Sequence, residues 1–130
     1  MEASTRDGLR DALDAWLEAT RRGDIEAQMA FYPDVVPVYY TWRNVRSAAV
    51  LAEKRKVFGE AWTLHVRAAT PQIARTADGH AAVTKFRKAY AIEGPRVRRR
   101  GEVLQELRWI RTEDGWKIAS ERDAAVLARY

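Results

Sequence analysis

The chain has 130 residues, of which 47% are hydrophobic and 32% charged, and it carries a formal net charge of +5. This balance indicates one ordinary globular domain over residues 1–130, and no apolar run approaches the roughly 20 residues that a membrane-spanning helix needs. Cysteine is absent and the two histidines, His65 and His80, lie in different segments. These counts argue against disulfides, thiolate chemistry and histidine-rich metal sites, and no metal or cofactor is predicted.

Residues 1–7 contain no apolar stretch of the kind that signal peptides carry. As written, the chain is therefore expected to stay in the cytoplasm. A periplasmic or envelope location is the alternative if the chain is a fragment of a longer exported protein.

Two helices are predicted near the N-terminus. Apolar residues recur at helical spacing over 4–22, with Ser4 or Thr5 able to cap the start and Gly23 able to end the helix. Asp24 can cap a second, shorter helix. The buried face of the first helix is expected to consist of Leu9, Leu13, Trp16, Leu17 and Thr20.

A strand is predicted next, over 35–42, and a third helix over 45–60. Pro37 indicates that the strand starts late or runs along an edge. Alternation along this strand puts one set of residues on one face: Val36, Val38, Tyr40 and Trp42. In the third helix, the predicted inward residues are Val50, Leu51, Val57 and Phe58, and the predicted outward residues are Glu53, Lys54, Arg55 and Lys56.

The remainder reads as strands joined by tight turns. The dipeptide Asp78-Gly79 is a strong hairpin signal, and the segment 124–130 is expected to be a short tail that could be helical. Strands are predicted over 62–69, 72–75, 80–92, 102–112 and 116–123. Helices followed by a long meander predict an α+β fold, a cone-shaped, curved antiparallel sheet wrapped around the N-terminal helices.

Short patterns at both ends of the chain resemble the nuclear transport factor 2-like (cystatin-like) superfamily, which includes SnoaL-like polyketide cyclases. They are Trp16-Leu17-Glu18-Ala19, Gly23-Asp24, Phe31-Tyr32-Pro33-Asp34, Leu107-Arg108-Trp109 and Glu113-Asp114-Gly115-Trp116-Lys117-Ile118. Phe86, Lys88 and Tyr90 are similar to a Phe-x-Gln-x-Tyr pattern in domains attached to bacterial L,D-transpeptidases, with lysine in place of glutamine. The resemblance implies the cone fold and a back-to-back sheet dimer. It leaves function open, since the superfamily includes isomerases, dehydratases, cyclases and non-catalytic binders.

A pocket inside the cone is the predicted ligand site. Its expected lining residues are Trp16, Tyr40, Trp42, Lys88 and Tyr90. Glu106 and Glu121 are candidate general bases and Tyr40 is a candidate hydrogen-bond donor, because acid–base chemistry needs a carboxylate held in an apolar pocket. Alternatively the aromatic residues simply fill the core and Lys88 is salt-bridged.

The basic loop between the strands over 80–92 and 102–112 is the sharpest charge feature. Its arginines, Arg96, Arg98, Arg99 and Arg100, could bind an anionic surface or pair with Glu93 and Glu102. The loop has no aromatic residue for base stacking, which argues against nucleic acid.

The strand over 102–112 has apolar residues on both faces, including Trp109. It therefore predicts a homodimer through the outer face of the sheet.

Three hypotheses follow. The leading one is a non-catalytic domain that binds a small, hydrophobic ligand or a partner in the cone, because the strand over 35–42 lacks the carboxylate that the related isomerases place there. The second is an isomerase, lyase or cyclase that acts on a hydrophobic small molecule. The third is an anionic-surface binder that uses the arginine loop.

Overall fold

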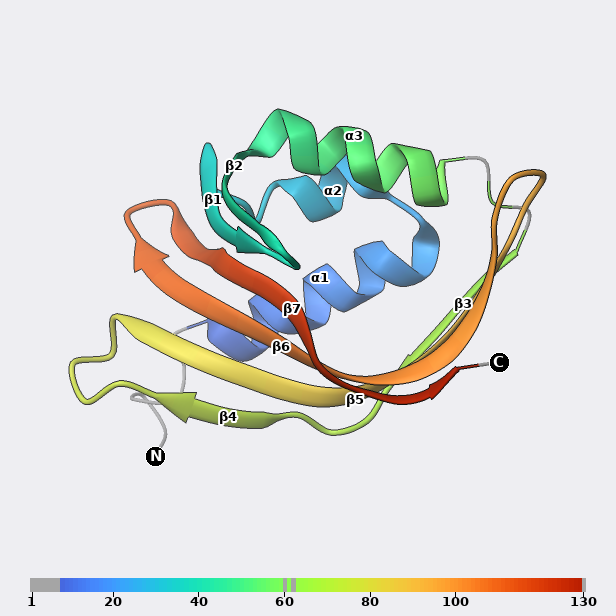
Figure 1. Cartoon of the computed structure of the whole chain (residues 1–130). Helices are drawn as coiled ribbons and strands as arrows, with labels where there is room; N and C mark the ends of the chain where they lie inside the picture. The colour runs from blue at the N-terminus through green and yellow to red at the C-terminus, as the bar shows by residue number, and fades with distance from the viewer. Residues whose placement is uncertain (1–7, 60, 62, 130) are drawn as a thin grey trace.

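The structure is a computed structural model and describes residues 8–59, 61 and 63–129. Three helices come first, with a strand pair between the second and the third, and the rest of the chain is strand (Figure 1). The helices are α1 (Leu9–Arg22), α2 (Ile25–Met29) and α3 (Ser47–Phe58). The strands are β1 (Val35–Tyr39), β2 (Trp42–Arg46), β3 (Thr63–Ala68), β4 (Gln72–Arg75), β5 (Ala81–Glu93), β6 (Arg98–Thr112) and β7 (Gly115–Arg129).

The two N-terminal helices confirm the predicted pattern. Leu9, Leu13 and Trp16 are fully or almost fully buried, as expected for one apolar helix face. Gly23 ends α1 in the left-handed conformation, and the Asp24 carboxylate accepts the Ala27 N–H at 3.1 Å to cap α2. The predicted caps at residues 4 and 5 lie outside the described residues.

The described strands form one curved, open sheet in the order β2-β1-β7-β6-β5-β3, and β4 also pairs with β5. The prediction of an antiparallel sheet is wrong at one point, because β1 runs parallel to β7 through Val38↔Ser120 and Tyr39↔Glu121. No short turn joins these two strands, so no hairpin imposes an antiparallel direction on them. Pairing to β7 begins just after Pro37, which fits the missing N–H of that residue.

A hairpin replaces the single strand predicted over 35–42. The chain turns at Tyr40 and Thr41, and Tyr39 pairs with Trp42. Tyr40 adopts a φ of 54°, which is uncommon for a residue other than glycine. The predicted common face of Val36, Val38, Tyr40 and Trp42 is therefore wrong beyond Val38, since the turn interrupts the alternation and Trp42 pairs with Tyr39.

The last strand is longer than predicted. β7 continues to Arg129, which pairs with Gly101 of β6, so the helical tail is wrong over 124–129, and residue 130 lies outside the described residues. The segment Ala124–Ala128 is compatible with a helix by local propensity, but the adjacent β6 offers a ladder of hydrogen-bonding partners. Tertiary pairing outweighs the local preference here.

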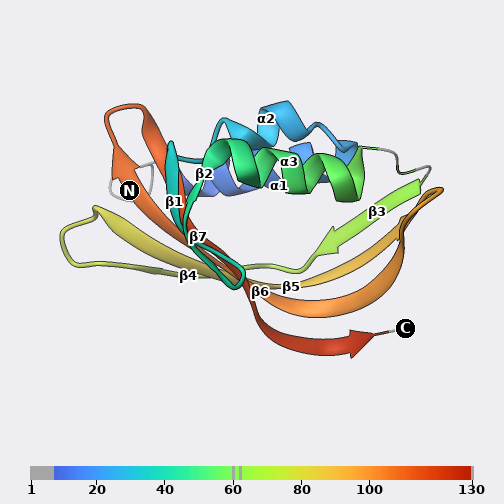
Figure 2. The same cartoon turned by 45° about the horizontal axis from the view of Figure 1, so that its top comes forward.

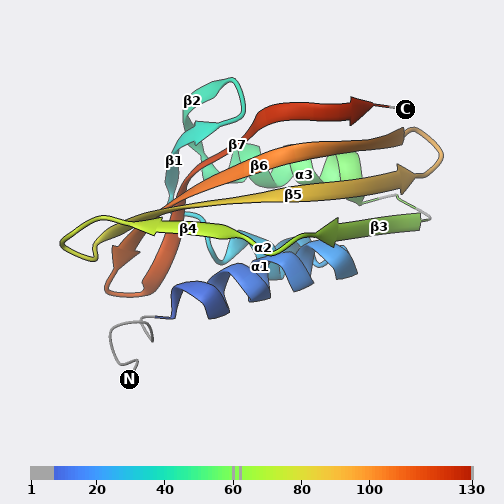
Figure 3. The same cartoon turned by 90° about the horizontal axis from the view of Figure 1, so that it is seen from below.

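The helices cover the concave face of the sheet, and the convex face is open (Figures 2 and 3). Leu107 and Trp109 of β6 point into this core with Phe86 of β5, while Leu104 and Ile110 lie on the other face by alternation. Apolar residues on both faces of β6 are thus confirmed, although Trp109 belongs to the core. None of the helices in the described part of the chain has the length and apolar character needed to cross a bilayer.

Candidate functional site

The carboxylate of Glu121 is the centre of a buried polar cluster at the floor of the cone. Glu121 comes from β7, beside Leu107 of β6, and is 3% exposed. Oε1 accepts a hydrogen bond from the Tyr32 hydroxyl, and Oε2 accepts one from the Tyr40 hydroxyl at 3.3 Å. The Lys54 ammonium lies 3.4 and 3.5 Å from the two oxygens. Three separate segments of the chain therefore converge on one side chain of β7.

Aromatic rings enclose the Lys54 ammonium. Its nitrogen lies 5.3 Å from the ring centre of Tyr32, 5.4 Å from that of Tyr39 and 6.0 Å from that of Trp16. Trp16 also donates its indole N–H to the Tyr32 hydroxyl at 3.1 Å. The π faces and the carboxylate of Glu121 together replace the water that this cation loses on burial.

The prediction that Lys54 points outward is wrong. Val50, which precedes Lys54 by four residues, is fully buried, and Lys54 is 2% exposed. Residues four apart share a helix face, so Lys54 follows Val50 inward, with Val57 on the same side. The four-residue spacing of Val50 and Lys54 is the signal in the sequence for this inward position, although Lys54 lies among charged neighbours.

The unusual backbone of Tyr40 aims its side chain into the cone. The Tyr40 N–H donates to the main-chain carbonyl of Glu121 at 2.7 Å, which anchors the turn. Gln105 donates its side-chain N–H to the Tyr40 hydroxyl at 3.4 Å. Gln105 is completely buried, and its side-chain oxygen has no hydrogen-bond partner among the described residues. An acceptor thus remains unsatisfied beside the cluster.

Burial and the charge of Glu121 set the protonation of the surrounding groups. Burial first, and Glu121 second, raise the pKa of Tyr32 and of Tyr40, so both stay protonated donors. Burial lowers the pKa of Lys54, while Glu121 opposes that change. At the floor of the cone, the two hydroxyl groups therefore remain donors to Glu121.

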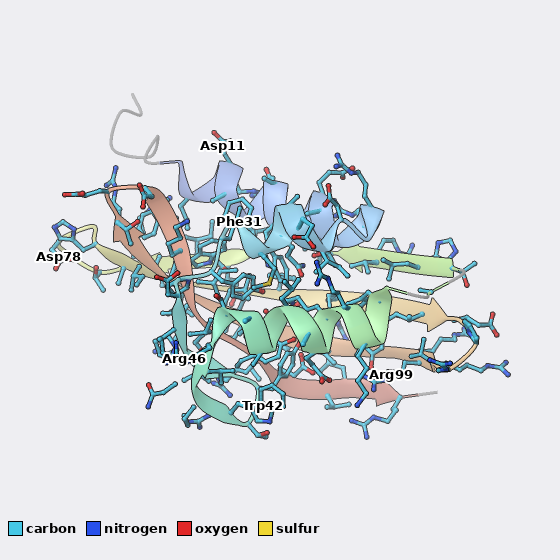
Figure 4. All side chains as sticks on the ribbon, turned by 90° about the horizontal axis from the view of Figure 1, so that it is seen from above. Asp11, Phe31, Trp42, Arg46, Asp78 and Arg99 are labelled. Carbon is cyan, nitrogen blue, oxygen red and sulfur yellow. The ribbon has the colours of Figure 1, made fainter. Side chains whose placement is uncertain are left out.

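A cavity of about 300 Å³ opens above this floor. Trp16, Tyr40, Trp42 and Lys88, four of the five predicted pocket residues, line it, together with Val57 and Phe58 of α3. Trp42 and Arg99 lie along the same side of α3 (Figure 4). The cavity thus has a polar floor and aromatic and aliphatic walls.

A second cavity of about 130 Å³ adjoins the first and shares Tyr40, Lys88 and Arg99 with it. Tyr90, the fifth predicted pocket residue, lines this compartment, as does Asp123. Burial raises the pKa of Asp123, with Lys88 opposing the shift, and burial lowers the pKa of Lys88. Asp123 was absent from the predicted site, because the predicted strand over 116–123 ended at this residue.

Glu106 does not lie in the cone. It pairs in register with Lys85 and Arg122, on the face opposite Leu107. Its carboxylate contacts Arg122 at 2.9 Å and Arg108 at 3.2 Å. Although burial raises its pKa, the arginine hydrogen bonds lower it more. Because adjacent strand residues alternate in direction, Glu106 cannot act as a base in the cone.

The predicted arginine loop is divided between two faces. Residues 98–100 belong to β6, and alternation sends Arg99 toward the cone, where it borders both cavities. Arg98 lies 3.8 Å from Glu93, and Arg100 is in register with Ala91. The four arginines thus do not share one binding face, and anion binding by them stays a prediction.

No protein-family model matches the chain, and no curated protein matches it. Several solved structures do match the chain. A proposed dehydratase of the NTF2-like family from Streptomyces avermitilis is 22% identical, with a TM-score of 0.71 over 90% of this chain and 92% of the other. An NTF2-like protein from Cytophaga hutchinsonii is 17% identical, with a TM-score of 0.72 over 96% and 99%. A proposed polyketide cyclase from Pseudomonas putida is 18% identical, with a TM-score of 0.64 over 89% and 90%.

The chain has the nuclear transport factor 2-like fold. This confirms the resemblance and the α+β cone inferred from the sequence. At these identities the NTF2-like fold is shared while the activity is not thereby established. The likeness to domains of L,D-transpeptidases stays a prediction.

Proposed function

We propose that the protein binds a small organic molecule inside the cone. The cavity of about 300 Å³ over the Glu121 cluster carries this proposal, because its volume and its mixed polar and apolar lining are typical of ligand sites. The matching ligand has a flat, largely apolar body against Trp42 and Phe58. One polar group of the ligand would contact Tyr40 and Lys54 at the floor.

The state of Glu121 favours binding over chemistry at this carboxylate. Both oxygens already accept hydrogen bonds, and Lys54 lies within ion-pair distance of each. A general base needs a free oxygen within reach of the substrate proton. Glu121 therefore organises the floor and does not abstract protons.

The test is a screen of small aromatic compounds by chemical-shift mapping on the isolated chain. Trp42→Ala should weaken any hit, because it removes a wall of the cavity. Ile110→Ala is the matched control, since Ile110 is 38% and Trp42 44% exposed and Ile110 lies on the outer face. Hits that are equally sensitive to both changes, or that shift only outer-face residues, would contradict the proposal.

A second candidate is an isomerase, lyase or cyclase with Asp123 as its base and Tyr40 as a donor. Asp123 lines the smaller cavity with Tyr40, and burial raises its pKa, as acid–base catalysis near neutral pH requires. Under this candidate, Asp123→Asn abolishes turnover of a bound compound without weakening its binding. Unchanged turnover in that variant would eliminate it.

We also propose that two copies associate through the outer face of the sheet. Leu104 and Ile110 supply apolar contact there. The side chains around them are Lys85, Arg87, Glu102, Glu106, Arg108 and Arg122, four basic and two acidic. Two such faces repel at low salt, so dimerisation measured by sedimentation should strengthen as salt is added. Ile110→Glu should give monomers; a salt-independent dimer that tolerates this change uses another surface.

A further inference from the structure

We propose that Lys88 is a reactive amine that captures small aldehydes in the cone as an imine. This inference deepens the proposed ligand-binding function by naming a ligand class, and it rests on that function because the cone must admit the aldehyde. It uses the second lysine of the site, which the Glu121 cluster leaves unpaired.

Lys88 is placed to meet a molecule in the cone. It lies on the inner face of β5, opposite Val103 of β6, and it borders both cavities. Its side chain is partly exposed, in contrast to that of Lys54, which is 3% exposed. A ligand in either compartment can therefore reach the Lys88 nitrogen, whereas Lys54, which also borders the larger cavity, is 3% exposed and held by Glu121.

The two lysines also differ in their partners. Lys54 is held by Glu121 at 3.4 Å. The Lys88 nitrogen lies 5.9 Å from the ring centre of Tyr90, and no described carboxylate lies within ion-pair distance of it. A cation in a partly apolar site without a close counter-ion favours loss of its proton. The neutral amine that results is the nucleophilic form.

The pKa of Lys88 shifts in the direction that this chemistry needs. Burial lowers it, the charges of Glu121 and Asp123 oppose the decrease, and the positive charge of Lys54 adds a smaller decrease. These groups, Arg99, which borders both cavities, and Glu53, which borders the larger one, are the charges that face Lys88 in the described structure.

Imine formation consumes only the Lys88 amine and the aldehyde, and it releases water. The neutral Lys88 nitrogen adds to the aldehyde carbon and gives a carbinolamine. Loss of the hydroxyl then forms the carbon–nitrogen double bond, and the two amine protons leave with the oxygen as water. This loss needs a proton donor at the oxygen. Asp123 lines the same small cavity, and its raised pKa favours the protonated carboxyl. Asp123 is therefore the group that we assign to this step.

The cavity also limits the aldehyde. The smaller compartment has a volume of about 130 Å³, so an unhindered aldehyde carried on one ring or a short chain fits the space near the amine. Val57 and Phe58 supply an apolar wall. Benzaldehyde has this shape and is the probe of choice.

The experiment incubates the protein with benzaldehyde and cyanoborohydride near neutral pH, which reduces an imine to a stable secondary amine. Adducts are located by peptide mass spectrometry. We expect Lys88 to be labelled severalfold faster than Lys56, Lys85 or Lys117, because a lowered pKa raises the neutral fraction of the amine. Lys88→Arg should remove this adduct, and the control Lys85→Arg should leave it.

Asp123→Asn should slow labelling at Lys88 while the circular dichroism spectrum stays unchanged, which keeps the proposal testable if Lys88→Arg does not fold. Equal labelling of all lysines, or preferential labelling elsewhere, overturns the inference. Benzyl alcohol separates the two proposals. If it shifts cone resonances while benzaldehyde gives no adduct at Lys88, the reactive lysine is wrong and ligand binding stands. If benzyl alcohol shifts no cone resonance and benzaldehyde gives no adduct at Lys88, both proposals fail for this ligand class.

Discussion

The ammonium of Lys54 and the carboxylate of Glu121 lie 3.4 Å apart although 67 residues separate them in the chain, and both side chains are 3% exposed. This pair joins α3 to β7, the covering helix to the sheet. Its hydrogen bonds extend to Tyr32 and Tyr40. The floor of the cone is thus one connected unit whose parts depend on each other.

Removing one partner of this pair should be costly. Lys54→Met leaves the Glu121 carboxylate buried without its cation, and we expect a loss of about 3–5 kcal/mol in the free energy of unfolding. The double variant Lys54→Met/Glu121→Gln should lose less than the sum of the two single variants. Urea unfolding measures all three. Strict additivity would show that the two groups do not interact.

Tyr32→Phe tests the hydrogen bonds of the cluster. The change removes the donor to Glu121 and the acceptor of the Trp16 N–H, which leaves buried groups unpaired and should cost about 1–3 kcal/mol. Tyr39→Phe is the matched control, because the Tyr39 ring is also buried but no hydrogen bond of its hydroxyl is found among the described residues. Equal losses in the two variants would contradict the assigned role of the Tyr32 hydroxyl.

The raised pKa of Asp123 predicts a pH-dependent effect of Asp123→Asn. The folded chain holds the Asp123 proton above the unfolded pKa near 3.8, so stability falls as pH rises from there through the folded pKa. Once the pH exceeds the folded pKa, the ionised carboxylate is destabilising, and Asp123→Asn should raise the melting temperature. Below the unfolded pKa both forms are neutral and the difference should disappear. A variant that is less stable than the parent at neutral pH would refute this assignment.

Glu106→Gln tests the outer-face ion cluster. It leaves Arg108, Arg122 and Lys85 without their shared carboxylate. We expect a loss of roughly 1 kcal/mol, smaller than for Lys54→Met, because these cations are well hydrated and screened. The loss should shrink as salt is added, and ligand binding in the cone should not change. Weakened cone binding would contradict its placement on the opposite face.

Local patterns predicted most of the fold. The spacing of Leu9, Leu13 and Trp16 determined the buried face of α1, since helix geometry alone places them together. Alternation likewise put Phe86, Lys88 and Tyr90 on one face of β5. These inferences succeeded because a continuous element fixes the relative directions of its own side chains.

The candidate site depended on contacts between elements that are distant in the sequence, and no local pattern predicts such contacts. The turn at Tyr40 reversed the strand, and β7 extended past Asp123 because β6 lay beside it. Glu121 and Glu106 looked equivalent in the sequence, yet pairing placed one carboxylate inside the cone and the other outside it.

The sequence by itself therefore determined the helices, most of the strands and most of the apolar faces that form the cone. The tertiary structure decided which charged groups meet, because Lys54 and Glu121 are brought together by the packing of α3 over the sheet, and a buried charge is stable only where packing supplies its partner.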